Sequence, residues 1–344
     1  MMSSKTFGFL RATVVCLLIL IGSCAPAGKE ITAAKVRVEK APAPEAVRLA
    51  LKFAPQDSTS YKATTEEELS FKYEGTLPTN ADSSQGRSCK KTELTFTEQI
   101  QSIDDKGNAV VKITIEDLKY SSIIKDKTVL DFDKSKNNQP TTPLARLIGQ
   151  SYTIEIAPTG QVVRIIDVNQ AQAAVDGPAA GNETALAMVS QQTIKDRHGT
   201  LVLPAADQNQ LHTGGNWSNT RSFSFKFMGS KSYERVYTLK EVKDANNHRT
   251  AIVDMSAIPT SKMAEQLHKE HTSTDLSGKF DSTGTYTGRL EFDLTAGKVK
   301  KYIEKVQLEW VAVDPYPRTG REREEGPAAM RLGAARLYTL EKID

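Results

Sequence analysis

An apolar alternation with a period of two residues recurs along most of this chain and constrains its fold more than any other feature. It begins near Val47 and returns in runs that share one parity: Leu69, Phe71 and Tyr73; Leu94 and Phe96; Val111, Ile113 and Ile115; Tyr152, Ile154 and Ile156. This period places apolar side chains on one face of a β-strand and polar side chains on the other. The pattern therefore predicts an antiparallel sheet with one buried face and one wet face.

The segments between these runs favour hairpins over helical crossovers. Gly, Asn and Asp occur at 104–108, 158–160, 244–247 and 295–297, and Gly and Asn tolerate the positive φ of tight hairpins. Helical signals are few. The run 143–148, with Pro first and Gly149 after it, predicts a short helix. The Ala- and Gln-rich region 168–195 predicts one or two helices, interrupted at Gly177-Pro178.

The two halves of the chain resemble each other. Leu-Ser-Phe-Lys-Tyr-Glu-Gly at 69–75 matches Phe-Ser-Phe-Lys-Phe-Met-Gly at 223–229, and two later pairs of segments follow in the same order. We interpret this as a duplicated β-module, with copies at about 58–166 and about 213–343 and the region 168–195 between them. Chance similarity among β-hairpins is the alternative.

These patterns predict a mainly β fold in a single domain over 46–344. We expect a strongly curved antiparallel sheet or open barrel built from the two modules, because joining them removes exposed strand edges. One or two helices should cover its concave side. The alternative is two small β-domains with separate cores, joined by 168–195.

The N-terminus is typical of an exported protein. Lys5 and Arg11 precede an apolar run at 12–21, whose helix would rise only about 15 Å, too short for a membrane span. This pattern predicts a signal peptide. The segment Ile21-Gly-Ser-Cys24 resembles the lipobox of bacterial lipoproteins, which implies cleavage after residue 23 and lipidation of Cys24. An ordinary secretory signal with an incidental cysteine is the alternative.

The lipobox resemblance also implies a cellular location. Several acyl chains such as palmitate hold a protein firmly to a membrane, so residues 24–45 would form the lipidated N-terminus and a flexible tether. The residue after Cys24 is Ala25 and not Asp. In the sorting pattern of such lipoproteins this indicates the outer membrane, with the protein facing the periplasm. The formal net charge is +3, and about +1 after loss of Lys5 and Arg11, which gives no reason to expect nucleic acid as a partner.

Candidate reactive residues are scarce. Cys89 would be the only free thiol of the lipidated protein, and Arg87, Lys90 and Lys91 are expected to favour its thiolate. Because no histidine partner is evident, we interpret Cys89 as an incidental loop thiol.

The strongest metal candidate is His268 with His271, to which Glu265 would add a carboxylate. The hydrophilic surroundings favour a solvated helix or loop instead. His198, His212 and His248 are isolated, and each is expected in a surface or loop position. The chain contains neither a nucleophile elbow nor a phosphate loop. We therefore assign no catalytic, cofactor-binding or metal-binding residue.

Aromatic side chains of equal parity occur on two predicted strands. The first set is Trp217, Phe223, Phe225 and Phe227, and the second is Trp310 with Leu308 and Val306. Either they form the core of the sheet, which we favour, or they line a ligand cavity.

A family resemblance covers most of the chain, roughly 47–343. The chain resembles uncharacterised bacterial lipoproteins that carry a domain of unknown function. The segments that carry the resemblance are 143–154, Pro158-Thr-Gly-Gln-Val162, Gly214-Gly-Asn-Trp217, 284–288 and 292–299. Gln150 stands where their pattern has Lys. These motifs are turn and strand signatures, so the resemblance implies a fold and no established activity.

We therefore expect a lipid-anchored cell-envelope protein that binds or scaffolds without catalysis. Its partners would be the membrane, through the anchor, and either an apolar ligand such as a lipid or another envelope protein. No cofactor is expected. The alternative is an enzyme with a dispersed active site, recognisable as a polar cleft with several convergent titratable groups.

Overall fold

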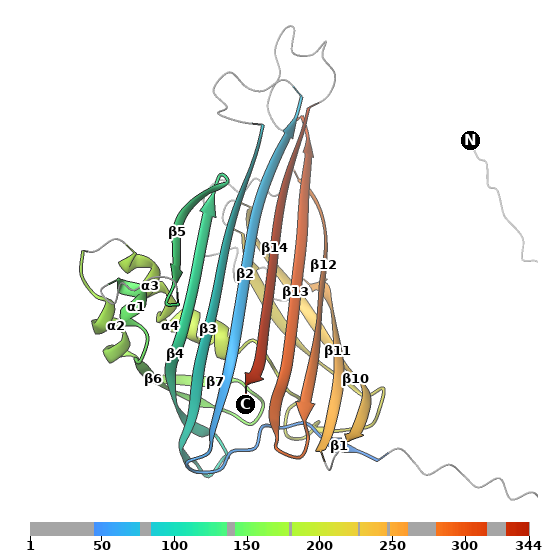
Figure 1. The fold of residues 1–344 in the computed structure, drawn as a ribbon. Helices are drawn as coiled ribbons and strands as arrows, with labels where there is room; N and C mark the ends of the chain where they lie inside the picture. The colour runs from blue at the N-terminus through green and yellow to red at the C-terminus, as the bar shows by residue number, and fades with distance from the viewer. Residues whose placement is uncertain are drawn as a thin grey trace, which may run out of the picture. The chain divides into compact units, whose positions relative to one another are not determined.

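A computed structural model describes residues 45–75, 84–135, 142–178, 181–225, 228–245, 248–260, 280–314 and 328–343. Most of these residues belong to one antiparallel sheet of 12 strands, accompanied by four described helices (Figure 1). The predicted mainly β, antiparallel fold is confirmed.

The elements follow one another as β-hairpins, with the helices grouped in the middle of the chain. The first half contains β1 (Val47–Arg48), β2 (Ser58–Glu74), β3 (Gln85–Ile103), β4 (Ala109–Ile124), β5 (Lys127–Asp133), α1 (Pro143–Arg146), β6 (Ser151–Ile156) and β7 (Val162–Asp167). The helices α2 (Asn169–Val175), α3 (Asn182–Met188) and α4 (Gln191–His198) come next. The second half contains β8 (Gln210–Leu211), β9 (Asn216–Ser224), β10 (Ser230–Ala245), β11 (His248–Thr260), β12 (Asp281–Asp293), β13 (Lys298–Val313) and β14 (Ala329–Ile343).

The strand order shows how the two halves share the sheet. It runs β7-β6-β4-β3-β2-β14-β13-β12-β11-β10-β9, with β5 paired to β4 and β1 paired only to β8. The strands at the two ends, β7 and β9, are not paired with each other, so the sheet of described residues is open. Each half is a meander. The strands of the first meander follow one another from β2 to β7 and those of the second from β9 to β14, and both series run in the same direction across the sheet.

The two meanders join where β2 pairs with β14. This pairing extends from Ser60 opposite Ile343 to Glu74 opposite Ala329. An ion pair between Arg336 Nε and Glu67 Oε1, 3.7 Å apart, crosses the same junction. The buried apolar residues of both halves form one continuous cluster.

Side chains from strands that are not neighbours meet on one face of the sheet, here called the inner face. Arg221 Nη1 on β9 lies 2.9 Å from Glu304 Oε1 on β13, although four strand spacings separate β9 from β13. In a flat sheet that separation would be about 19 Å. The sheet therefore bends towards the inner face, with β9–β11 behind β12 and β13 in Figure 1.

Helix α1 begins at Pro143 as predicted and ends at Arg146, two residues before the predicted end. The Thr142 hydroxyl accepts a hydrogen bond from the Ala145 N–H, Pro143 opens the helix, and Gly149 follows it with a φ of 85°. These are the features that begin and end a helix.

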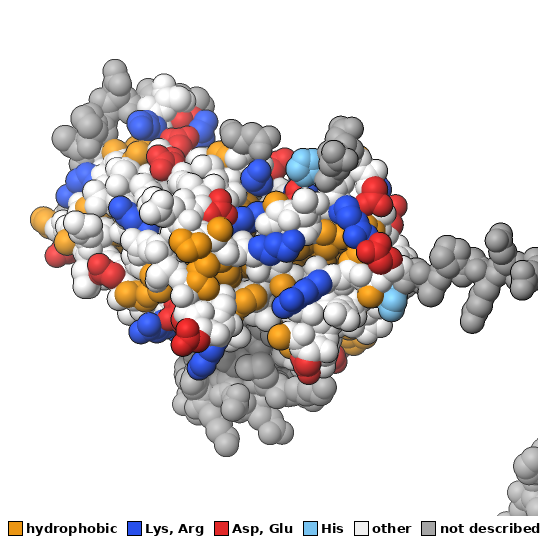
Figure 2. Space-filling model, turned by 90° about the horizontal axis from the view of Figure 1, so that it is seen from below, with side chains coloured by type: hydrophobic (Ala, Val, Ile, Leu, Met, Phe, Trp, Pro, Cys, Tyr) orange, Lys and Arg blue, Asp and Glu red, His pale blue; other side chains and the backbone are white. Residues whose placement is uncertain are grey.

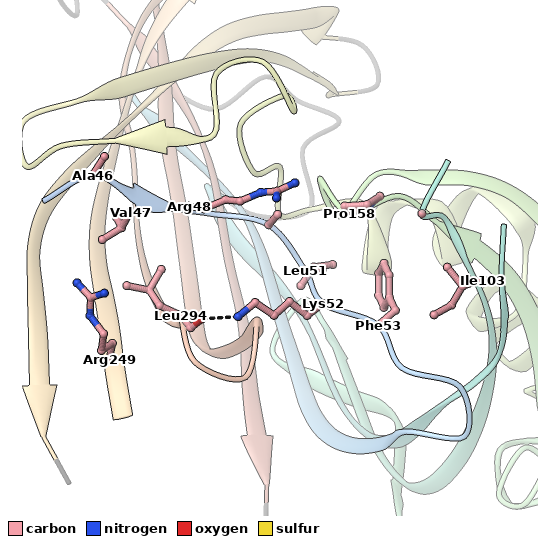
Figure 3. A pocket seen from close by; sticks show the side chains of 12 residues that line it. Ala46, Val47, Arg48, Leu51, Lys52, Phe53, Ile103, Pro158, Arg249 and Leu294 are labelled. Atoms are coloured by element: carbon pink, nitrogen blue, oxygen red, sulfur yellow. Dashed lines mark hydrogen bonds between the residues drawn. The ribbon is translucent and has the colours of Figure 1, made fainter. Parts of the chain in front are cut away.

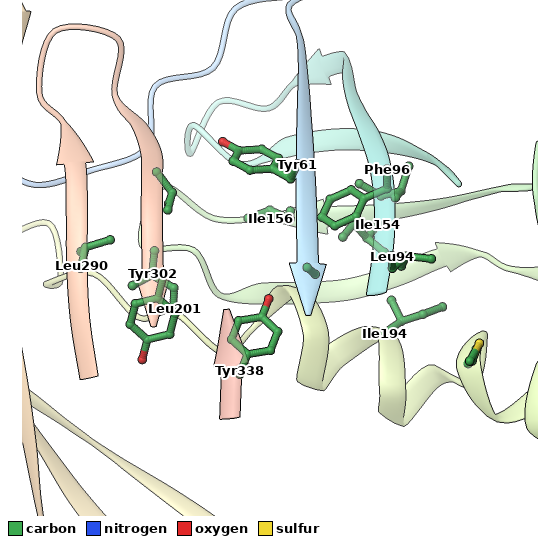
Figure 4. Packing of buried hydrophobic residues seen from close by; sticks show 14 of the residues in the cluster. Tyr61, Leu94, Phe96, Ile154, Ile156, Ile194, Leu201, Leu290, Tyr302 and Tyr338 are labelled. Carbon is green, nitrogen blue, oxygen red and sulfur yellow. The ribbon is translucent and has the colours of Figure 1, made fainter. Parts of the chain in front are cut away.

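The region 168–195 contains parts of three helices, where one or two were predicted. The additional break follows Met188, because the Ser190 side chain accepts a hydrogen bond from the Thr193 N–H and so begins α4. Helix α4 lies on the inner face: the Tyr338 hydroxyl on β14 donates to the Arg197 carbonyl at 2.9 Å. Figure 4 shows Ile194 of this helix packed among the buried side chains of the sheet.

The alternating run at 47–53 is mostly not a strand, contrary to prediction. The backbone N–H groups of Leu49, Leu51 and Lys52 donate to the carbonyls of Asn209, Pro158 and Gly297 respectively. Because these acceptors come from three separate loops, the segment crosses the lower end of the sheet instead of joining one strand (Figure 1). We call residues 45–57 the strap.

Candidate functional site

A pocket lies at the lower end of the sheet, between the strap and the hairpin turns. Its cavity volume is about 520 Å³, within the range of small-molecule sites. The lining residues are Ala46, Val47, Arg48, Ala50, Leu51, Lys52, Phe53, Ile103, Gly107, Pro158, Arg249 and Leu294 (Figure 3). We call this the basal pocket.

The wall of the basal pocket is largely apolar. Leu51 and Phe53 of the strap are half-buried and pack against the core, as does Leu294 after β12. Ile103 at the end of β3 remains 36% exposed. In Figure 2, which views the molecule from below, apolar side chains gather in the middle of this face with Lys and Arg beside them.

The cations of the basal pocket differ in how they are paired. Lys52 Nζ donates to the Leu294 and Thr295 carbonyls at 2.9 and 3.0 Å, which ties the strap to the β12–β13 turn (Figure 3). Arg249 forms a two-pronged pair with Glu45 at 3.2 and 3.1 Å, and this hydrogen bonding raises the pKa of Arg249. Arg48 is exposed, and its side chain makes no hydrogen bond or ion pair with another described residue. Arg48 is therefore the cation that this pocket can offer to a ligand.

A second hollow, of about 580 Å³, lies beside the ends of β2, β13 and β14. Two of its lysines are paired with acids: Lys298 Nζ lies 2.8 Å from Asp57 Oδ2, and Lys301 Nζ lies 3.6 Å from Glu341 Oε1. This surface has the character of a solvated charged face.

The aromatic residues of equal parity point towards the inner face, where they form part of the core. Trp217 is stacked on Tyr237 with ring centroids 5.0 Å apart, and its Nε1 donates to the Val202 carbonyl at 2.9 Å. Phe225 contacts Trp310 edge to face at 5.1 Å. Phe227 lies outside the described residues.

Cys89 lies in strand β3, not in a loop. Its pKa is raised, first by burial, and the carboxylate of Glu68 at 3.9 Å from Sγ adds to this effect. Arg87 acts in the opposite direction but does not prevail. The expectation that basic neighbours would favour the thiolate is therefore wrong.

His198 is buried, contrary to the expectation of a surface or loop position. Its Nε2 lies 2.8 Å from the Tyr152 hydroxyl and its Nδ1 lies 3.7 Å from Glu98 Oε1. Parity rules for strands gave no signal for it, because it is the last residue of α4. His212 and His248 are exposed, as expected.

The remaining predicted site residues cannot be placed. Cys24, Glu265, His268 and His271 lie outside the described residues, and lipidation of Cys24 stays a prediction. Within the described ranges, no group of three or more His, Cys, Asp or Glu side chains is arranged to hold a metal ion. None of the helices in these ranges has the length and apolar character to cross a bilayer.

A buried charge cluster on the inner face was missed by the sequence analysis. Glu304 on β13 pairs with Arg221 on β9 at 2.9 Å and with Arg235 on β10 at 3.0 Å. The Tyr302 hydroxyl donates to the same carboxylate at 2.7 Å. One signal was available, because Arg221 has the same parity as Trp217 and so occupies an inward position.

No curated protein matches. Among solved structures, one titled "Lipid-protein interactions in lipovitellin" matches at a TM-score of 0.32 and 9% identity, over 85% of this chain and 26% of that chain. The chain thus spans about a quarter of the length of that protein. OpdQ of Pseudomonas aeruginosa matches at a TM-score of 0.18 and 10% identity, over 83% and 98% of the two chains.

A family model supplies the clearest relationship. It is described as "Family of unknown function (DUF6263)" and matches residues 106–299, more than half of the 344-residue chain. The matched region extends from the turn before β4 to the start of β13. It includes the four described helices, β4 to β7 of the first meander and β9 to β12 of the second. The chain belongs to DUF6263, a family of unknown function.

Proposed function

We propose that this protein is a lipid-anchored component of the bacterial cell envelope whose folded body binds an apolar ligand without catalysis. The observation that carries the proposal is the basal pocket, in which Leu51, Phe53 and Ile103 form an apolar wall beside the exposed Arg48. The pocket is built from the first described residues after the predicted tether. The proposal includes a location for the protein in the outer membrane, facing the periplasm, which is inferred from the lipobox.

The chemistry of the basal pocket favours an acyl chain that ends in an anionic group. Burial of methylene groups against an apolar wall supplies affinity, and a guanidinium at the rim attracts a carboxylate or phosphate. The pocket lining contains three basic residues and no acid. It therefore offers no acid–base couple, which supports binding over catalysis.

Binding is tested by titrating the full chain with a fluorescent fatty acid. Wild-type protein should take up the probe with saturation. Ile103→Glu places a charge in the apolar wall at a partly exposed position, and should weaken binding about tenfold, equivalent to about 1.4 kcal/mol. Val313→Glu is the matched control, since Val313 is a strand-end residue, 68% exposed, outside the pocket. Uptake that does not saturate, or equal affinity for both variants, would contradict the proposal.

The anchor requires its own experiment. A Cys24→Ala variant should lose the mass of the lipid and leave the membrane fraction, whereas Cys89→Ala should retain both. Intact-mass measurement and cell fractionation report these outcomes. A Cys24→Ala protein that stays lipidated and membrane-bound would overturn the anchor.

A further inference from the structure

The buried charges of the inner face are unbalanced. Arg221 and Arg235 share one carboxylate, that of Glu304, at 2.9 and 3.0 Å. The side chains of Arg235 and Glu304 are only 3% and 2% exposed, and that of Arg221 is 12% exposed. Two guanidinium groups with one carboxylate leave a positive charge in a place where an unpaired charge is costly.

The Glu304 carboxylate already accepts three hydrogen bonds. Oε1 accepts from Arg221, and Oε2 accepts from both Arg235 and the Tyr302 hydroxyl. The other contacts of Arg235 are neutral: its Nη1 donates to the Thr200 carbonyl at 2.8 Å and its Nε donates to Asn219 Oδ1 at 2.7 Å. Among the described residues, no second acid pairs with either arginine.

Several buried polar atoms on the same face have no hydrogen-bond partner. Three of them are Asn219 Nδ2 on β9, the Tyr286 hydroxyl on β12 and Trp310 Nε1 on β13. Tyr286 and Trp310 are each 3% exposed. Nearly all buried polar groups in proteins are paired, and each of these three atoms is able to donate. The inner face thus combines surplus positive charge with unused donors.

Aromatic rings connect these donors. The Phe223 ring lies 5.2 Å from the Arg221 guanidinium carbon and 5.5 Å from the Tyr286 ring. Phe225 links Phe223 at 6.2 Å to Trp310 at 5.1 Å. Apolar surface therefore adjoins the donors, and solvent reaches the cluster at Arg221, whose side chain is 12% exposed.

We propose that this inner-face cluster binds the oxyanion head group, carboxylate or phosphate, of an amphipathic ligand. Arg221 supplies the charge, the Tyr286 hydroxyl donates to the head group, and Phe223 and Phe225 contact the apolar chain. The cluster shares no residue with the basal pocket, so the proposal stands or falls separately from the proposed function.

The test is calorimetric titration of the full chain with dodecanoate, dodecanol and inorganic phosphate. Dodecanoate should bind more tightly than dodecanol, which has the same chain without the charge. In an Ile103→Glu background, which weakens the basal pocket, Arg221→Gln should weaken dodecanoate binding at least about tenfold and leave dodecanol binding unchanged. Phosphate binding that Arg221→Gln abolishes would support the site and identify free phosphate as a source of the oxyanion.

Tyr286→Phe keeps the test informative even if Arg221→Gln fails to fold. If the Tyr286 hydroxyl has no binding role, removing this unpaired buried group should leave the melting temperature unchanged or raise it, without changing dodecanoate affinity. If it binds the head group, the affinity for dodecanoate should fall. Tyr61→Phe, in the lower core, is the matched control. Equal affinity of wild type and Tyr286→Phe for dodecanoate, or loss of binding in Ile103→Glu alone, would overturn this site.

Discussion

At the scale of single residues, His198 shows how burial shifts the pKa of a histidine. Arg197 Nη1 donates to the Tyr152 hydroxyl oxygen at 3.2 Å, so the hydroxyl proton is available to His198 Nε2 at 2.8 Å. The Tyr152 oxygen also has a second lone pair, so this contact fits either neutral tautomer of His198. Burial lowers the pKa of His198, and Arg197 adds to this effect, whereas Glu98, facing Nδ1, opposes it. The folded protein therefore binds a proton at His198 less readily than the unfolded chain does.

This arrangement predicts a loss of stability in mild acid. Because the pKa of His198 is lower in the folded state than its ordinary value of about 6.5, the unfolded state binds the proton first as pH falls. The contribution is complete above pH about 6.5 and is lost as pH falls through the folded-state pKa. Thermal melts from pH 7.5 to 5 should show a falling midpoint in wild type and a smaller fall in His198→Gln. Equal slopes would contradict a lowered pKa.

At the scale of elements, the sequence was informative wherever a signal was local. Val111, Ile113 and Ile115 alternate with polar residues, and all three are at most 1% exposed on β4. The signals that mark the start and end of α1, Pro143 and Gly149, were equally local. The alternation at 47–53 was misleading, because the same residue pattern buries Val47 and Leu49 while the backbone partners lie in distant loops.

The charge cluster escaped prediction for a related reason. Parity alone places Arg221, Arg235 and Glu304 on inward positions of three strands. It does not show that β9 and β13, four strand spacings apart, face each other. That proximity comes from the bend of the sheet, which no stretch of sequence encodes by itself.

The attachment of the strap predicts a large effect of one small substitution. Gly297 has a φ of 65°, accepts the Lys52 N–H at 3.0 Å, and a Cβ there would overlap the Lys52 side chain. Gly297→Ala should therefore cost more than the ordinary penalty of positive φ, about 1 kcal/mol. Gly149→Ala is the control, since Gly149 has a φ of 85° and nothing within 4 Å of the added Cβ. Urea unfolding should show the larger loss of unfolding free energy for Gly297→Ala. Equal losses for the two variants would mean that the strap moves aside without cost.

At the scale of the whole body, the junction of β2 with β14 makes the two meanders neighbours along 15 residue pairs. The buried residues on either side of it belong to one cluster. A substitution that destabilises the core of one meander should therefore lower the stability of the other as well. Two domains with separate cores would instead unfold independently.

The two tryptophans allow this to be measured, because Trp217 and Trp310 both lie in the second meander. Ile113→Ala removes a fully buried side chain from the first meander, which should lower the free energy of unfolding by about 2–5 kcal/mol. If the body unfolds as one unit, the urea midpoint of tryptophan fluorescence should fall by the same amount as that of circular dichroism. Val129→Ala, at a 61% exposed position of the first meander, should shift neither. A fluorescence midpoint unmoved by Ile113→Ala would show that the halves fold separately despite their shared sheet.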